Sequence, residues 1–161
     1  MAKINPGRVI LGGIAAGIVA DILDYPVDGL WLAPRWSEGL KALNHPAAFS
    51  LNAIVWFQLI GIAGGIVAVW LYAAMRPRFG PGVKTAVRAG IAVWVLAALL
   101  PNLTFMYATG LFGRRLTLYT TLGALVEIVV GTIVGAALYK EESAGEGKPV
   151  ASEKPREAVR A

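Results

Sequence analysis

Three aspartates interrupt the first long apolar stretch of the chain, at positions 21, 24 and 28 of the segment "ADILDYPVDG". Their spacing of three and four residues places them within about 60° on one face of an α-helix. A charged carboxylate at the centre of a bilayer is disfavoured by roughly 2.5–3.5 kcal/mol. We therefore expect this face to point into a protein interior. The chemistry open to it is proton exchange or cation binding, and the alternative is a set of hydrogen-bonded acids that only fix helix packing.

Other polar residues fall at a similar depth in the remaining apolar stretches. At a rise of 1.5 Å per residue, Asp21 and Glu127 lie at the centres of the first and fourth stretches, and Asp24 lies about 4 Å further out. Asn102 follows Pro101 at the centre of the third stretch. The sequence therefore predicts a buried polar layer, with Asp28, about 10 Å outward, in the solvated outer interface rather than in a site. The predicted layer consists of Asp21, Asp24, Asn102 and Glu127, with Gln58 and Thr104 as supports.

No lysine or arginine lies near the bilayer midplane to pair with these acids. Three ways of stabilising them remain: protonation to the neutral form, hydrogen bonds from neighbouring amides and hydroxyls, or a bound cation. Pro26 and Pro101 each remove a helical hydrogen bond nearby, and transporters use interrupted helices to line ion and substrate sites. A proline kink that serves only packing is the alternative.

Several function classes are excluded or disfavoured. The chain has no cysteine and its one histidine is His45, which excludes thiolate metal sites, cysteine nucleophiles and bis-histidine haem. Asp21 and Asp24 resemble a Mg²⁺-binding pair only weakly, because no span holds a second acidic cluster. We expect no enzyme, no catalytic residue, no metal site and no cofactor. The net charge of +5 comes from basic residues at the ends of apolar segments, so we expect no nucleic-acid partner.

Composition and charge placement predict an all-α membrane protein, a bundle of four transmembrane helices in the lipid bilayer. Hydrophobic residues make up 57% of the 161 residues and the mean hydropathy is +0.62. Eleven Lys and Arg residues lie at the amino end, in the second connection and in the tail, against four on the other side. This asymmetry predicts cytoplasmic termini and a multi-pass protein of the bacterial cytoplasmic membrane. The expected spans are about 9–34, 50–75, 88–113 and 116–139, within a domain of residues 1–140.

The segments outside the spans carry three further expectations. The basic, apolar amino end is expected to be a retained first span rather than a cleaved signal peptide. The connection "RWSEGLKALNHP" has the spacing of a short amphipathic helix, with an irregular loop as the alternative. Residues 141–161 are rich in charge, Pro, Gly and Ala and are expected to form a disordered cytoplasmic tail.

Pairs of glycines four residues apart occur in three of the expected spans, at positions 13 and 17, 61 and 65, and 131 and 135. This spacing lets helix backbones approach closely in a membrane. It favours a tightly packed bundle over a wide pore. The same glycine-rich faces would also suit a homo-oligomer.

Three segments carry a family resemblance: "INPGRVILGGIAAGIVADIL", "VWLYAAMRPRFGPGVKTAVRAGIAVW" and "LVEIVVGTIVGAALYKEE". Over roughly residues 4–142 the chain resembles a family of small uncharacterised bacterial four-helix membrane proteins, a domain of unknown function. The segment "DGLWLAPRWSEGLKAL" is more weakly similar to a second such family. The resemblance implies fold and membrane location and assigns no activity to any residue.

These observations favour an integral membrane protein with a structural or accessory role, whose buried acids specify packing. The alternative is a small carrier, or a proton- or cation-conducting protein, that uses the midplane acids as exchanging groups. Four spans are few for alternating access, so the carrier hypothesis predicts a dimer or a larger assembly.

Overall fold

The computed structural model describes residues 4–45 and 50–141, and within these residues every regular element is a helix. Four helical stretches of 25 to 29 residues are long and apolar enough to cross a membrane. At 1.5 Å per residue each exceeds the roughly 30 Å hydrocarbon core of a bilayer. The expected all-α, four-helix architecture of a multi-pass membrane protein is thus confirmed. The stretches are Pro6–Trp31, Leu51–Phe79, Val83–Thr109 and Arg114–Leu138.

The first stretch joins α1 (Pro6–Asp24) to a π-helical segment, η1 (Tyr25–Trp31). The second and fourth are single helices, α3 (Leu51–Phe79) and α6 (Arg114–Leu138). The third is composite and contains two further π-helical segments, η2 and η3. Its elements are α4 (Val83–Trp94), η2 (Val95–Leu99), α5 (Leu100–Leu103) and η3 (Thr104–Thr109).

The two prolines expected to break spans are absorbed by helical turns instead. Pro26 lies at the start of η1, and Pro101 lies at the start of α5, directly after η2. Proline lacks the N–H of the i→i−4 bond, and the wider i→i+5 turn tolerates that loss without ending the helix. The η1 segment ends with such a bond, from the Leu32 amide to the Val27 carbonyl at 2.8 Å. The backbone therefore changes its helical phase at these sites while each span stays continuous.

The structure defines the first connection between spans and the end of the second span. The first forms a real helix, α2 (Ala33–Ala42), which resolves the choice between helix and loop. The second span runs to Phe79 rather than Met75, because Pro77 lies in the last turn and removes only one helical bond. The Gly80 amide closes that turn on the Arg76 carbonyl at 2.9 Å, with Gly80 at a φ of 79°.

Glycines position α1 between two other helices. On one side, a Cβ on Gly13 or Gly17 would collide with the backbone of α3 at Ile66 or Ile62. On the other side, Gly131 and Gly135 of α6 meet backbone carbonyls of α1. Side chains larger than hydrogen at these positions would force the helices apart. The paired glycines are thus used inside one chain, and an oligomer would have to form on another surface.

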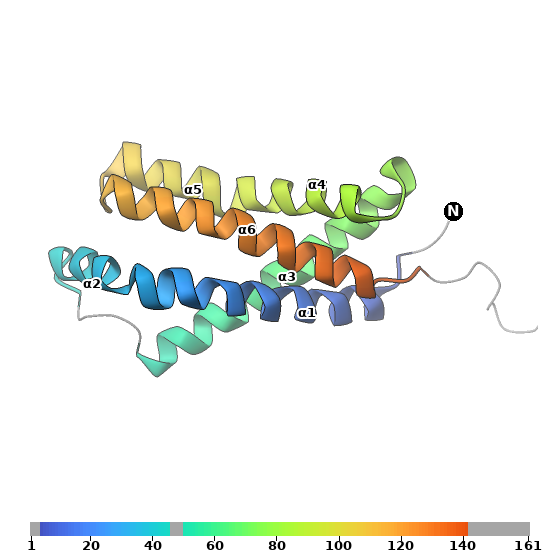
Figure 1. Cartoon of the computed structure of the whole chain (residues 1–161), viewed down its shortest axis with the longest axis horizontal. Coiled ribbons are helices and arrows are strands. Elements are labelled where there is room, and N and C mark those ends of the chain that lie inside the picture. Colours follow the sequence, from blue (N-terminus) through green and yellow to red (C-terminus); the bar gives the residue numbers. More distant parts are fainter. Residues whose placement is uncertain (1–3, 46–49, 142–161) are drawn as a thin grey trace, which may run out of the picture.

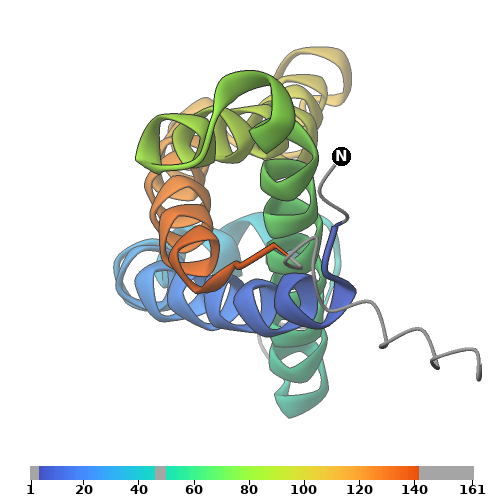
Figure 2. The ribbon, with the colours of Figure 1, turned by 90° about the vertical axis from the view of Figure 1, so that its right-hand side faces the viewer.

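The bundle is closed at one end and splayed at the other. A core of mostly small residues joins α1, α3, α4 and α6 where the described chain begins and ends, beside the turn at Gly80 and Gly82 (Figure 1). Seen from that end, α1, α3, α4 and α6 are arranged around a common centre (Figure 2). At the other end α3 crosses obliquely away from its neighbours (Figure 1), and almost every side chain of residues 51–60 is exposed. Residues 142–161, nearly all of the expected tail, lie outside the described residues.

Candidate functional site

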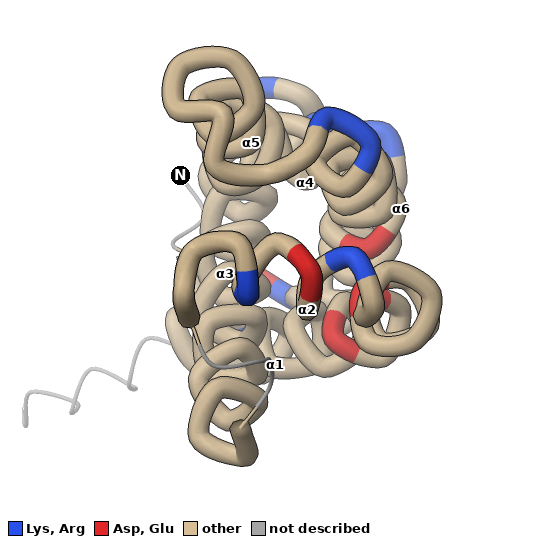
Figure 3. The backbone as a smooth tube through the Cα atoms, turned by 90° about the vertical axis from the view of Figure 1, so that its left-hand side faces the viewer, with Lys and Arg blue, Asp and Glu red and all other residues tan. Residues whose placement is uncertain are grey.

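Three carboxylates from two helices converge inside the bundle. Asp24 ends α1, Asp28 lies in η1, and Glu127 lies midway along α6. One oxygen of each lies within 4.8 Å of one oxygen of each of the others, and we call these three residues the acidic cluster. Figure 3 shows acidic positions on the first span and on α6 at neighbouring places in the bundle. The expectation that Asp28 is a solvated interfacial residue is therefore wrong.

The spacing from Asp24 and the contacts with α2 and α6 explain how Asp28 joins the cluster. Asp28 is four residues, about one helical turn, from Asp24, so both side chains lie on one side of the first span. Asp28 Oδ1 accepts hydrogen bonds from Trp36 Nε1 of α2 at 2.7 Å and from the Thr120 hydroxyl of α6 at 2.9 Å. Both donors bind the same oxygen, so the carboxylate of Asp28 is anchored to α2 and to α6.

Helix α2 is held over this end of the site by apolar contacts. Leu32, which precedes the helix, is fully buried. The Trp36 ring meets the Phe112 ring edge to face at a centroid distance of 5.2 Å. Such pairs stabilise a structure by about 0.5–1.5 kcal/mol beyond the area that they bury. These contacts fix the indole that donates to Asp28.

Glu127 is the most buried acid of the cluster, with only 7% of its surface exposed. Its Oε1 atom is buried and has no hydrogen-bond partner among the described residues. Gly123, one turn earlier, makes room for it, since a Cβ there would lie 3.0 Å from Oε1 and 3.1 Å from Val27 Cγ1. A buried carboxylate oxygen without a donor costs free energy unless a proton or an ion satisfies it.

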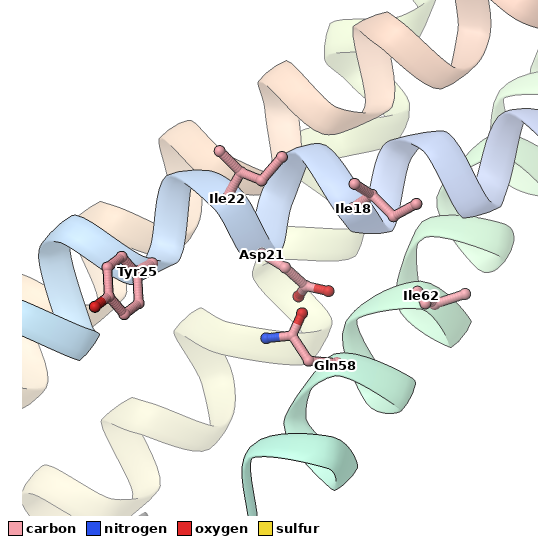
Figure 4. Close-up of a pocket in the computed structure, with 6 residues that line it drawn as sticks. All are labelled: Ile18, Asp21, Ile22, Tyr25, Gln58 and Ile62. Carbon is pink, nitrogen blue, oxygen red and sulfur yellow. The ribbon is translucent and has the colours of Figure 1, made fainter.

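Asp21 lies at the crossing of α1 and α3, apart from the cluster. Its carboxylate lies against Gly61, whose missing Cβ leaves the space that the carboxylate fills, and its Oδ2 atom is buried without a hydrogen-bond partner. The Gln58 side chain of α3 points toward it (Figure 4). A groove of about 320 Å³ lies on this side and is lined by Asp21, Gln58, Tyr25 and three isoleucines. Gln58 is thus placed beside one predicted acid.

A second hollow, a partly open cavity of about 280 Å³, lies between α1, α3, α4 and α6. Asp21 and Gln58 border both hollows, so they form the wall between them. Glycines and alanines supply much of the cavity lining, and no lysine or arginine lines it. The polar groups that border the cavity are Asp21, Asp24, Gln58, Glu127 and Thr132.

Asn102 and Thr104 hydrogen-bond to groups other than the carboxylates. The Asn102 amide donates to the Thr121 hydroxyl at 2.8 Å, and Thr121 in turn bonds its own helix at the Thr117 carbonyl. The Thr104 hydroxyl bonds the Leu100 carbonyl at 3.0 Å and is exposed. Neither contacts a carboxylate, because the π-helical segments that flank α5 change the rotational phase that a regular helix would give these residues. Asn102 therefore joins α5 to α6 instead.

The acids have no basic partner within residues 4–45 and 50–141. The ion pair found there joins Arg76 to Glu141 at 3.4 Å, in the tightly packed end of the bundle. Figure 3 places lysines and arginines of the connections at the near end of the bundle in that view, beside α2 and α6. Three carboxylates within one cluster repel one another strongly in a low-dielectric interior. The arrangement is therefore suited to taking up protons or a cation.

Sequence reasoning did not assign Trp36 and Thr120 to the site. Trp36 lies in a connection whose spacing predicts only an amphipathic helix, and Thr120 carries no signal in the sequence. The available clue was the four-residue spacing between Asp24 and Asp28, which matches one helical turn.

Neither protein-family models, nor curated proteins, nor solved structures include a match to this chain. The resemblance to small bacterial four-helix proteins stays a prediction.

Proposed function

We propose that this chain is a small carrier or conducting protein of the bacterial cytoplasmic membrane, in which a proton or a cation occupies the acidic cluster. The observation that carries the proposal is the buried Oε1 atom of Glu127, which has no hydrogen-bond partner among the described residues and belongs to a side chain that lines the cavity. An acid that serves only packing is expected to be satisfied by donors. A carboxylate that exchanges a proton or a cation needs an oxygen that is not already occupied by a hydrogen-bond donor.

The comparison between Asp28 and the other acids supports this choice. Asp28 receives two hydrogen bonds and is suited to a positioning role. Asp21 and Glu127 each keep a buried oxygen without a donor. Each such group costs about 1–3 kcal/mol, or more when charged. A protein that keeps two of them beside a cavity gains from binding a proton or an ion there.

The cavity and the groove suggest how an ion reaches the cluster. Asp21 and Gln58 separate the two hollows, and small residues at 61, 64 and 65 line the inner one. We infer that Asp21 relays between the groove and the cluster, with Asp24 next along the same helix. Complete alternating access in four spans calls for a second copy, and the exposed outer half of α3, residues 51–60, is the surface available for it.

Flux across proteoliposomes tests the proposal. The full chain is reconstituted, a membrane potential is imposed, and internal pH is followed with a trapped dye, with parallel vesicles reporting cation entry. We expect Glu127→Gln and Asp24→Asn to abolish flux while keeping the helical signal in circular dichroism. Glu38→Gln, which changes an exposed acid of α2 outside the cluster, is the matched control and should retain flux. Wild-type vesicles no more permeable than empty ones would contradict the proposal.

A structural or accessory role is the second candidate, and the double hydrogen bond on Asp28 favours it. In that case the acids serve to join η1, α2 and α6. Asp28→Asn would then lower thermal stability strongly while no acid variant changed any flux. Copurification of a specific membrane partner that is lost with Asp28→Asn would support this role.

A further inference from the structure

The geometry points to a hard divalent cation, of the size of Ca²⁺, bound between Asp24, Asp28 and Glu127. The inference deepens the proposed function, because it names the ion class for the same site. Three carboxylate oxygens, one from each residue, lie within 4.8 Å of one another. Calcium–oxygen distances are about 2.3–2.6 Å, so two ligands on opposite sides of the ion lie up to about 5 Å apart. The three oxygens therefore lie close to the spacing of one calcium coordination sphere.

The second observation is the buried Oε1 atom of Glu127, which has no hydrogen-bond partner among the described residues. This side chain is more than nine-tenths buried, its Oε1 atom has no donor, and it borders the cavity together with Asp24. Asp28 is held in place at its Oδ1 atom by hydrogen bonds from Trp36 and Thr120. Ligand carboxylates oriented by outer hydrogen bonds are a recurrent feature of metal sites.

Ligand type selects the class of ion. All three ligands are carboxylates, and hard oxygen ligands suit Ca²⁺, Mg²⁺ and Mn²⁺ rather than soft metals. The chain has no cysteine, and His45 lies outside the cluster, beyond α2. A doubly charged ion also offsets more of the repulsion among three carboxylates than a monovalent ion does.

The cavity has room for the water ligands that complete the coordination of the ion. Ca²⁺ takes six to eight oxygens, so three monodentate carboxylates leave several positions for water or for second carboxylate oxygens. The cavity of about 280 Å³ beside Asp24 and Glu127 has room for several waters, since one water takes about 30 Å³. Mg²⁺ holds its ligands at about 2.1 Å and would require the three acids to move closer together.

Terbium luminescence tests the inference in the full chain. Tb³⁺ replaces Ca²⁺ at oxygen sites and emits when a nearby indole is excited, and Trp36 touches the cluster through its bond to Asp28. With the protein in nanodiscs of neutral lipid, we expect saturable Tb³⁺ emission that Ca²⁺ displaces at lower concentration than Mg²⁺, and that K⁺ does not displace. Glu127→Gln and Asp24→Asn should each weaken Ca²⁺ competition about tenfold or more. Glu38→Gln should leave it unchanged.

Two variants keep the test sound if one of them misfolds, and circular dichroism with size-exclusion chromatography checks both. Absence of saturable emission in the wild type would overturn the inference, and so would Ca²⁺ competition equal to wild type in well-folded Glu127→Gln. Proton flux in proteoliposomes separates this failure from failure of the proposed function. Flux that needs Glu127 without Ca²⁺ binding refutes the divalent site only, whereas Ca²⁺ binding without any flux supports the site and refutes the carrier.

Discussion

The indole nitrogen of Trp36 donates a 2.7 Å hydrogen bond to Asp28 Oδ1, eight residues earlier in the chain. This bond joins α2, outside the four spans, to the π-helical end of the first span. It couples the position of α2 to the geometry of the acidic cluster. Movement of α2 would remove one of the two donors to this oxygen and leave the bond from Thr120.

Trp36→Phe removes this donor and keeps the ring that packs on Phe112. We expect the free energy of unfolding to fall by about 1–3 kcal/mol, the range for a buried hydrogen bond to a carboxylate. The midpoint of thermal unfolding in detergent measures the effect. Trp56→Phe, at a ring that is 58% exposed on α3, is the control and should change little. Equal midpoints for the two variants would mean that the bond adds nothing to stability.

Two adjacent glycines of α3 provide a matched pair. A Cβ on Gly65 would collide with the backbone of α1 at Gly13 and Gly17, whereas a Cβ on Gly64 would meet nothing within 4 Å. We expect Gly65→Ala to lower stability by about 1–3 kcal/mol through overpacking. Gly64→Ala should be neutral or stabilising by up to about 1 kcal/mol, because alanine favours the helix. Thermal unfolding of both variants decides, and a Gly65→Ala protein as stable as Gly64→Ala would argue against the close α1–α3 packing.

The four spans follow from the sequence because length and hydropathy alone determine them. The inward placement of Asp21, Asp24 and Glu127 also follows, since lipid exposure of these acids is too costly. The sequence misplaces Asp28 in the outer interface, because its depth in the membrane is derived from the rise of a regular, isolated helix. That rise contains no information about α2 folding back over η1 or about Thr120 of α6.

Asn102 shows a second limit of predicting side-chain positions from the sequence. Its depth in the third span is compatible with the acids, but its direction depends on the helical phase. The π-helical segments on both sides of α5 shift that phase and turn the amide toward Thr121. Residue spacing predicts direction only while the helix is regular. Gln58 escaped this error because α3 is a regular helix across it.

Glu127→Gln separates binding from stability. The substitution keeps the shape of the side chain and removes a buried acid whose Oε1 atom has no donor. We expect thermal stability without added cation to be unchanged or higher, because replacing an unpaired buried acid relieves repulsion from Asp24 and Asp28. Wild-type protein should gain stability on addition of Ca²⁺ and the variant should not. A large loss of stability in the variant without Ca²⁺ would show that Glu127 is a packing group.

The closed end of the bundle is held by Arg76, which forms an ion pair with Glu141 at 3.4 Å and lies over the rings of Tyr72 and Tyr139. The Tyr139 hydroxyl also accepts a hydrogen bond from the backbone N–H of Asn5, so this group of contacts ties both ends of the described chain to α3. We expect Arg76→Gln to lower stability by about 1–2 kcal/mol, the sum of two cation–π contacts and a partly exposed ion pair. Arg78→Gln changes an exposed arginine two residues away and should have little effect. The rate of tryptic cleavage after Lys140 gives a second measurement, because loss of these contacts would free the backbone at Tyr139 and Lys140. If Arg76→Gln and Arg78→Gln are cut at the same rate, the contacts of Arg76 with Tyr72, Tyr139 and Glu141 do not hold this part of the chain in place.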